Sequence, residues 1–273
     1  MRDNNSGRVV LITGATQGIG KATANLLLKK GFKVYGTSRN PDQASSVTFP
    51  LIKLDITDNV SVKECIKQVI SKEGRIDVLI NNISYPLCGS IADVSSEELQ
   101  QQFDTNFFGM HRMISEVLPI MLSNDYGKII NLGSIAGRAP LPYQASYSSS
   151  KAAIANYTDS LRMELFSRGI RVVLIEPSDT NTAVHSSRVY AKGFDEDLVA
   201  QNTIELMHKF EMAGASPKTI AKSILKAIKK KNPKPRYTFG FQSFLVAFLF
   251  RFLPISVQIW GLMLFYNIPR KKK

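Results

Sequence analysis

The sequence predicts an α/β fold: a doubly wound parallel sheet in a single domain, followed by an apolar C-terminal helical tail. Short runs rich in β-branched residues alternate with longer helical patterns, and the short runs are continuously apolar. Continuous apolar strands separated by helices indicate a parallel sheet covered on both faces. Polar or glycine-rich residues come directly after several of these runs. Because ligands bind such sheets beyond the carboxyl ends of the strands, these residues are the candidates for function.

The expected elements follow the chain in strict alternation. The strands are VVLITGA at 9–15, FKVYGTS at 32–38, VTFPLIKLDI at 47–56, IDVLINN at 76–82, GKIINLGS at 127–134 and IRVVLIEP at 170–177. The helical patterns between and beside them cover Lys21 to Lys30, Val60 to Glu73, Glu97 to Leu122 and Tyr147 to Arg168. This βαβ order is the one that places helices on both faces of one sheet.

The composition fits one core and no metal site. A chain of 273 residues with 44% hydrophobic residues can bury a full core, so we expect a domain at 1–240 and a tail at 241–273. Cys65 and Cys88 have neither metal-ligand spacing nor a disulfide-rich context, which favours free thiols in a reducing compartment. The histidines are scattered without a ligand pattern, at His111, His185 and His208.

The net charge of +13 indicates a membrane surface rather than nucleic acid. The lysines and arginines gather toward the C-terminal end and do not interleave with aromatic residues along a recognition element. The apolar stretch near the N-terminus is too short for a signal peptide and is better explained as a buried strand. We therefore expect a cytoplasmic protein that does not bind nucleic acid.

A glycine-rich turn, TGATQGIG at 13–20, comes after the first strand and opens a helix. Gly14 permits the turn, Gly18 lets the backbone approach a pyrophosphate, and Gly20 lets the helix pack close to the strand. A tight structural turn is the alternative, but the position between strand and helix favours nucleotide binding. The residues expected to line this part of the site also include Thr16, Gln17 and Ile19.

The second and third strands end in residues that suit NADP(H) more than NAD(H). Ser38 and Arg39 stand where an enzyme selecting NAD offers a carboxylate, and a cation there suits a 2′-phosphate. A solvated surface arginine is the alternative. Asp55, with Ile56 after it, could accept from the adenine amino group or cap the next helix, although Asp58 is the better candidate for the cap.

YSSSK, at 147–151, places a phenol and an amine four residues apart. On a helix these side chains share a face and can reach one ligand. An isolated Tyr-x-x-x-Lys usually marks only a solvated helix start, so the rest of the chain must decide.

Taken together, these motifs resemble the short-chain dehydrogenase/reductase family over roughly the first 240 residues. TGATQGIG, LDITD, NNIS, the Asn of DTNFFG, NLGS, YSSSK and IEPSDTNT occur in the family's order. The resemblance implies the Rossmann fold, an NAD(P)-dependent oxidoreductase and homodimers or homotetramers formed through the helices of Asn106 and Tyr147. The catalytic set it implies is Ser134, Tyr147, Lys151 and Asn106.

The implied roles come from the chemistry of moving a hydride to a carbonyl. Tyr147 would protonate the developing oxyanion, and the Lys151 ammonium, together with the oxidised nicotinamide, would lower the pKa of that phenol. Ser134 would hydrogen-bond the same oxygen, or serve only as a turn cap. In the family, the residue matching Asn106 holds a water that links the lysine to solvent.

Two positions depart from the family pattern. The chain has Asn82, Ile83 and Ser84 where the family has Asn-Ala-Gly, which puts a bulkier pair near the cofactor. Ser178 replaces the glycine after Pro177, which removes that glycine's access to positive φ. Pro177 and Thr182 are still expected to line the nicotinamide side.

The substrate is expected to be hydrophobic. The segment from Thr182 to about Ser216 lies where the family has its substrate lid. The loops SIAGRAPLPYQASY and SYPLCG are apolar and carry Arg138 as their only fixed charge, which suits a steroid-, retinoid- or lipid-like carbonyl. Ordinary loop packing explains their composition equally well.

The tail is apolar from Phe241 to Ile268, interrupted by Arg251 and Pro254. Neither half reaches the length of about 20 residues that crosses a bilayer, whereas basic clusters flank both ends, so an in-plane or hairpin-like helical pair fits. The tail also resembles those of family members that act on hydroxysteroids and acyl-glycerone phosphates. Packing on the domain or at a dimer interface is the alternative.

The sequence as a whole predicts an NADPH-preferring oxidoreductase for a hydrophobic carbonyl or secondary alcohol, peripheral on the cytoplasmic face of a membrane. The alternative is a catalytically silent, membrane-associated nucleotide sensor or scaffold on the same fold, because fold alone does not fix function.

Overall fold

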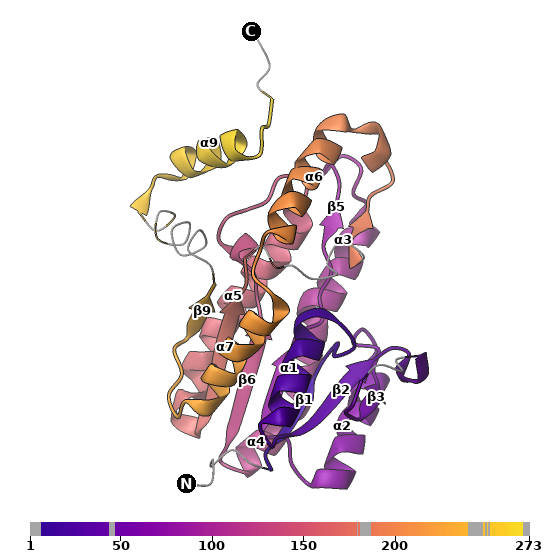
Figure 1. Cartoon of the computed structure of the whole chain (residues 1–273), viewed down its shortest axis with the longest axis vertical. Helices are drawn as coiled ribbons and strands as arrows, with labels where there is room; N and C mark the ends of the chain where they lie inside the picture. Colours follow the sequence, from indigo (N-terminus) through magenta and orange to yellow (C-terminus); the bar gives the residue numbers. More distant parts are fainter. Residues whose placement is uncertain are drawn as a thin grey trace.

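The chain forms a seven-stranded parallel sheet with helices on both faces (Figure 1). The computed structural model describes residues 7–43, 47–178, 180, 187–239, 248, 250 and 252–269. The strand order is β3-β2-β1-β4-β6-β7-β9, and every pairing is parallel. The expected doubly wound α/β fold is confirmed.

Six of the seven strands lie within the apolar runs expected from the sequence, and β9 is the exception. Their bounds are β1 Val9–Ile12, β2 Lys33–Ser38, β3 Leu51–Lys53, β4 Val78–Asn81, β6 Gly127–Leu132, β7 Ile170–Glu176 and β9 Arg236–Thr238. β1 pairs with β2 on one side and with β4 on the other, so the chain reverses its direction of winding there. Ligands of doubly wound sheets bind at this reversal, beyond the strands' carboxyl ends.

The two faces of the sheet bury separate apolar clusters. Helices α1 (Gly18–Lys29) and α7 (Pro217–Lys229) cover one face, and α2 (Asn59–Glu73), α4 (Gly109–Ser123) and α5 (Ala145–Leu165) cover the other. Apolar side chains of the central strands pack into both clusters, as period-2 alternation on a doubly covered sheet requires. The sheet is thereby fixed at the centre of the domain.

Asp58 begins α2, as expected. Its carboxylate accepts from the backbone amides of Val60 and Ser61 at 3.0 and 3.2 Å. A side-chain cap satisfies amides that have no partner within the helix. Asp55 is therefore left for another role.

The helical pattern expected from Glu97 to Leu122 is helical throughout, but it is not one continuous α-helix. The chain forms α3 (Ser96–Phe103), then a π-turn at Asp104–Phe108, then α4. A π-turn inserts one residue and rotates the helix beyond it, and such turns are frequent at functional sites. It places Asn106, 1% exposed, inside the protein.

Several elements were not expected from the sequence. They are β5 Leu87–Cys88 and β8 Val189–Tyr190, which pair with each other, α6 Leu198–Met212, α7, β9, and short 3-10 turns at Pro41–Gln43, Ile135–Gly137, Phe166–Arg168 and Phe194–Glu196. The two-stranded sheet is too short for any periodicity to reveal it. β9 pairs with β7 although its sequence is polar. Its Arg236 binds Glu176, a partner that only the folded protein brings near, so no local pattern predicts this strand.

The C-terminal helix α9 (Ile255–Phe265) stands apart from the body of the molecule, toward the end where α6 lies (Figure 1). None of its residues is buried. It joins the domain at its C-terminal end, where Phe265 stacks on Phe210 of α6 with ring centroids 5.0 Å apart, and Tyr266 packs against the apolar cluster around α6. Arg251 lies outside the described residues.

Among the described residues, no helix has the length and apolar character needed to cross a bilayer. Both cysteines are free and buried, and burial raises the pKa of the Cys65 and Cys88 thiols to about 12. Neither thiol is therefore a nucleophile near neutral pH.

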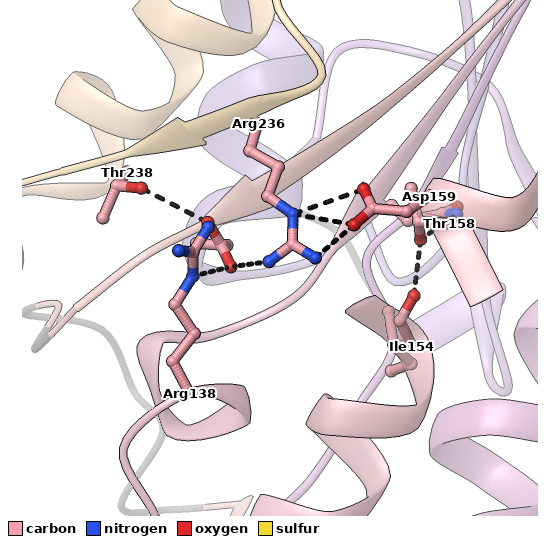
Figure 2. A network of polar contacts seen from close by, with 8 residues as sticks. Arg138, Ile154, Thr158, Asp159, Arg236 and Thr238 are labelled. Atoms are coloured by element: carbon pink, nitrogen blue, oxygen red, sulfur yellow. Dashed lines mark hydrogen bonds and ion pairs between the residues drawn. The ribbon is translucent and has the colours of Figure 1, made fainter. Parts of the chain in front are cut away.

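A fully buried carboxylate, Glu176, ties the carboxyl edge of the sheet together by binding Arg138, Arg236 and Thr238, which are labelled in Figure 2. It accepts two hydrogen bonds of 2.8 Å from Arg138 and one of 3.0 Å from Arg236. Arg236 also pairs with Asp159 of α5. One carboxylate thus connects β7, β9, α5 and the turn after β6.

Glu176→Gln should lower the free energy of unfolding by about 3 kcal/mol, because it leaves two arginines facing a neutral side chain. The cost stays at the lower end of the usual range because Arg138 and Arg236 are 30% and 26% exposed. Urea unfolding followed by circular dichroism measures it. Glu64→Gln, on the exposed side of α2, is the control and should change stability by less than about 0.5 kcal/mol.

Candidate functional site

One cavity of about 1630 Å³ extends along the carboxyl ends of the strands. It is lined by most residues selected from the sequence: Gly14, Thr16, Gln17, Gly18, Ile19, Ser38, Arg39, Asp55, Ile56, Asn82, Ser134, Tyr147, Lys151 and Pro177. Gly20 and Asn106 lie behind its wall, and Thr182 lies outside the described residues. The fold therefore brings the candidate nucleotide residues and the candidate catalytic residues to one place.

The glycine-rich turn has the geometry of a phosphate cradle. Gly14 and Gly18 adopt positive φ, at +67° and +54°. A Cβ on Gly20 would lie 2.2 Å from the Gly14 carbonyl oxygen, so only glycine permits α1 to begin this close to β1. The exposed amides at the start of α1 can bind a pyrophosphate, so these residues fit a dinucleotide.

Asn82 holds this turn in place from the neighbouring strand. Its Nδ2 donates to the carbonyl oxygens of Thr13 at 3.0 Å and Gly14 at 2.9 Å. Its backbone amide donates to the Thr13 hydroxyl at 2.9 Å. Asn82 thus shapes the cradle as well as lining it.

The ends of β2 and β3 form the polar end of the cavity. Arg39 is exposed, and Ser38 accepts from the Asn40 amide at 3.1 Å. Hydrogen bonds from Thr57, and then the charge of Arg39, lower the pKa of Asp55. Asp55 is therefore an ionised acceptor at neutral pH.

Lys151 is buried, and its ammonium nitrogen makes two hydrogen bonds. Nζ donates to the Leu132 carbonyl oxygen at 2.9 Å and to the Ser84 hydroxyl at 3.0 Å. It lies 5.6 Å from the centroid of the Tyr147 ring, which confirms the shared face expected from their spacing. Burial lowers the pKa of Lys151 to about 7.

The pKa of Tyr147 moves in the direction opposite to the one expected. Burial raises it to about 12, a hydrogen bond with Ser134 lowers it, and the Glu211 charge raises it. The protein alone therefore does not lower the pKa of this phenol, because desolvation outweighs every nearby charge and Lys151 itself is half neutral near pH 7. Tyr147 is a neutral hydroxyl that can donate a proton.

Ser134 caps a turn, which is one of the two roles considered for it, and its hydrogen bond to the substrate oxygen stays a prediction. Its hydroxyl accepts from the Ala136 amide at 3.1 Å and so caps the turn after β6. The same side chain hydrogen-bonds Tyr147 and lines the cavity. Arg138, the one fixed charge of this loop, turns instead to Glu176 and leaves the cavity wall uncharged here.

Asn106 acts from behind the cavity. Its amide accepts from the Tyr85 backbone amide at 3.0 Å and donates to the Tyr85 carbonyl at 3.0 Å and the Ser150 hydroxyl at 3.2 Å. It thereby clamps the segment whose Ser84 contacts Lys151. Its link to a water stays a prediction.

The residues that depart from the family pattern are accommodated by contacts with their neighbours. Ile83 packs against the core and occupies the space where a side chain on Gly14 would lie. Ser84 supplies an acceptor for Lys151. Ser178 has no positive φ and donates to the Phe239 carbonyl at 3.0 Å, so its lack of glycine's freedom has no consequence.

Sequence reasoning missed one whole wall of the cavity. Residues of the C-terminal region line it together with the catalytic set: Phe250, Leu253, Val257, Gln258, Gly261, Leu262, Phe265 and Tyr266. Arg188 and Glu211, from the segment expected to form the lid, line it as well. The apolar tail was visible in the sequence, but no local pattern indicates that it reaches the active site.

Residues 8–192 match the family model described as short chain dehydrogenase. The 3-ketodihydrosphingosine reductase of Bacteroides thetaiotaomicron is 37% identical over 269 residues, covering 96% of this chain and 98% of that protein. This similarity spans the tail as well as the domain.

Two solved structures share the fold. A short-chain dehydrogenase from Streptomyces avermitilis superposes with a TM-score of 0.81 at 24% identity, over 98% of this chain and 100% of that one. The 3-ketoacyl-(acyl-carrier-protein) reductase of Brucella melitensis, complexed with NADH, has a TM-score of 0.69 at 25% identity, over 81% of this chain and 90% of that one.

The buried Lys151 should make stability rise with pH. Its pKa is near 7 in the folded protein and about 10.4 when unfolded, so between these values the unfolded chain binds more protons. From pH 7 to pH 9 this group should add about 2 kcal/mol to the free energy of unfolding. The difference between wild type and Lys151→Met, measured by urea unfolding at both pH values, isolates it. An equal change in the two proteins would contradict the lowered pKa.

Proposed function

The chain belongs to the short-chain dehydrogenase/reductase family and is an NAD(P)-dependent oxidoreductase, and on this premise we propose that it reduces the ketone of a long-chain lipid with NADPH. One observation carries the proposal. The cavity that holds the Tyr147, Lys151 and Ser134 side chains is walled by the apolar C-terminal residues. A reacting carbonyl at Tyr147 would thus have an alkyl chain lying along an apolar surface.

The positions of the candidate catalytic side chains in one cavity support carbonyl reduction. Bound NADPH supplies the hydride. Tyr147 donates its proton to the substrate oxygen, and Ser134 hydrogen-bonds the same oxygen and fixes its position. Lys151 is charged in part near neutral pH, and in that form it stabilises the phenolate that remains.

NADPH is the proposed cofactor because a cation stands at the end of β2. Arg39 lines the cavity and can pair with a 2′-phosphate, and Ser38 beside it can donate a hydrogen bond. No carboxylate occupies the positions of Thr37, Ser38 or Arg39 to bind ribose hydroxyls. Asp55 lies further along, where the adenine amino group can donate to it.

A sphingoid-type ketone is the substrate we favour among hydrophobic ketones. The cavity wall is apolar at Leu141, Leu253, Val257 and Leu262, and the charge of Arg138 is neutralised by Glu176. The similarity to a 3-ketodihydrosphingosine reductase covers almost the whole chain, tail included. Steroid and retinoid ketones are bulkier alternatives for the same wall.

We also propose that α9 contacts a membrane on its cytoplasmic face. The helix is apolar all round, and Trp260, Ile259 and Leu264 are about half exposed, which is costly in water. The cations of residues 270–273 follow it in the sequence and would meet acidic headgroups, whereas Lys229 to Lys231 lie at the opposite edge of the sheet, where Lys128 binds the Lys230 carbonyl oxygen. A lipid substrate could then pass from the bilayer to the cavity along one helix.

The assembly state stays a prediction. Phe108, Met163 and Phe166, on or beside α4 and α5, are exposed apolar side chains where a homodimer or homotetramer would form. The alternative function, a silent nucleotide sensor or scaffold, has no need of Ser134, Tyr147 and Lys151 side chains that line one cavity.

Tyr147→Phe should abolish ketone reduction while NADPH still binds, because the change removes the proton donor and almost no volume. NADPH oxidation with 3-ketodihydrosphingosine measures turnover, and titration of NADPH fluorescence measures binding. Tyr157→Phe, on the same helix but not in the cavity lining, is the matched control and should keep full turnover. Turnover of Tyr147→Phe within about tenfold of wild type would show that another group is the acid.

Arg39→Asp should shift cofactor preference from NADPH toward NADH, because it replaces a phosphate partner with a phosphate repeller. The ratio of kcat/KM for the two cofactors measures this, with Arg171→Asp at the far end of the sheet as control. Equal use of NADPH and NADH by the wild type would refute the assignment directly.

Deletion of residues 241–273 should release the protein from anionic liposomes and leave the nucleotide site folded. High salt should weaken binding of the full-length protein without abolishing it, because burial of apolar surface adds to the attraction of the cations. Vesicle flotation measures association, and NADPH affinity reports the fold. Full-length protein that is monodisperse and ignores liposomes would overturn the membrane contact alone.

A further inference from the structure

A buried ion pair lies in the cavity wall and belongs neither to the catalytic set nor to the nucleotide motifs. Arg188 Nη2 and Glu211 Oε1 are 2.6 Å apart. Arg188 directly precedes β8, and Glu211 lies in the last turn of α6. Both residues line the cavity that Tyr147 and Lys151 also line. The pair is therefore within the chamber where the substrate must lie.

The surroundings of this pair are apolar. Leu141, Phe265 and Tyr266 line the same chamber, and Met207 is buried one turn before Glu211 on α6. Taking two charges out of water is costly, and apolar residues of similar volume often serve a purely structural contact as well. The position of this charged pair therefore indicates a role in binding a ligand.

Glu211 has the more exposed side chain of the two, although its Oε2 atom is buried. The Glu211 side chain is 16% exposed, whereas that of Arg188 is 2% exposed. At the Tyr147 hydroxyl, the effect of Glu211 that raises the pKa exceeds the effect of Arg188 that lowers it. The pair thus presents its negative end to the reacting centre, where a cationic group is favoured and an anionic group is repelled.

Arg188 also has a hydrogen-bond donor that a ligand can use. Its Nε is buried and has no hydrogen-bond acceptor among the described residues. A buried donor without an acceptor is costly, and a ligand oxygen would satisfy it. The ligand that completes this site carries a cationic donor for the carboxylate and a neutral oxygen for the guanidinium.

We propose that Arg188 and Glu211 form a head-group subsite for an amino ketone, in which Glu211 binds an ammonium group next to the reacting carbonyl and Arg188 donates to a neighbouring hydroxyl. This inference rests on the proposed reduction of a long-chain ketone. It specifies that the preferred ketone carries an ammonium group and a hydroxyl beside the reacting carbonyl. The alkyl chain lies along the apolar C-terminal wall, and the polar head lies at the ion pair.

The test compares two ketones of the same chain length, with NADPH, full-length protein and identical mixed micelles. One is 3-ketodihydrosphingosine, which carries the amine and the hydroxyl, and the other lacks both groups. Wild-type kcat/KM should be at least about tenfold higher for the amino ketone, the size of one charge-assisted hydrogen bond. An N-acetylated amino ketone, which has lost the positive charge, should fall to the level of the plain ketone.

Glu211→Gln should remove this preference. Its kcat/KM for the amino ketone should fall about tenfold, mainly through KM, while that for the plain ketone should change less than about threefold. The double variant Arg188→Gln, Glu211→Gln leaves no unpaired buried charge, so it avoids the folding defect that the single change could cause. It should lose the preference for the amino ketone to the same extent as Glu211→Gln. Glu205→Gln, on the exposed side of α6, is the matched control and should retain it.

The outcomes separate the two proposals. No turnover of either ketone by the wild type would refute the proposed function and the subsite with it. Turnover of both ketones without preference for the amine, or equal losses for both in the two Glu211 variants, would overturn the subsite alone. NADPH affinity and the urea midpoint, measured for each variant, identify losses that come from unfolding.

Discussion

The arrangement of the candidate active site depends most on the ion pairs of the Glu176 carboxylate. It is fully buried, and through Arg138, Arg236 and Asp159 it joins the turn after β6, strands β7 and β9, and helix α5. The turn positions Ser134 and the helix positions Tyr147 and Lys151. Because the guanidinium groups bind in fixed geometry, one carboxylate holds together the two elements that carry these three candidate catalytic side chains.

Burial gives the catalytic side chains their protonation states. Desolvation raises the pKa of Tyr147 to about 12 and lowers that of Lys151 to about 7, so the protein alone keeps the phenol neutral and the amine only partly charged. A neutral phenol is the form that donates a proton. The same low dielectric strengthens any charge brought by a ligand, so the acid responds to the ligand that occupies the cavity.

The cavity has a polar part and an apolar part. The strand ends supply the glycine turn, Asp55 and Arg39, whereas the C-terminal region supplies aliphatic and aromatic side chains, and Arg188 with Glu211 lies between. A single helix, α9, belongs both to this wall and to the exposed apolar surface. In the proposed function, this helix would link the access of a lipid to its reduction.

The sequence by itself determined the alternation of strands and helices up to β7, the glycine turn, the Asp58 cap and the shared face of Tyr147 and Lys151. Each depends on a short window, in which periodicity, capping or glycine geometry is encoded locally. Only the tertiary structure decided that β9 completes the sheet, that a π-turn directs Asn106 inward, that Ser84 binds Lys151, and that α9 reaches the cavity. It also decided the direction in which the pKa of Tyr147 moves. These features depend on burial and on partners far apart in the chain, which no local pattern contains.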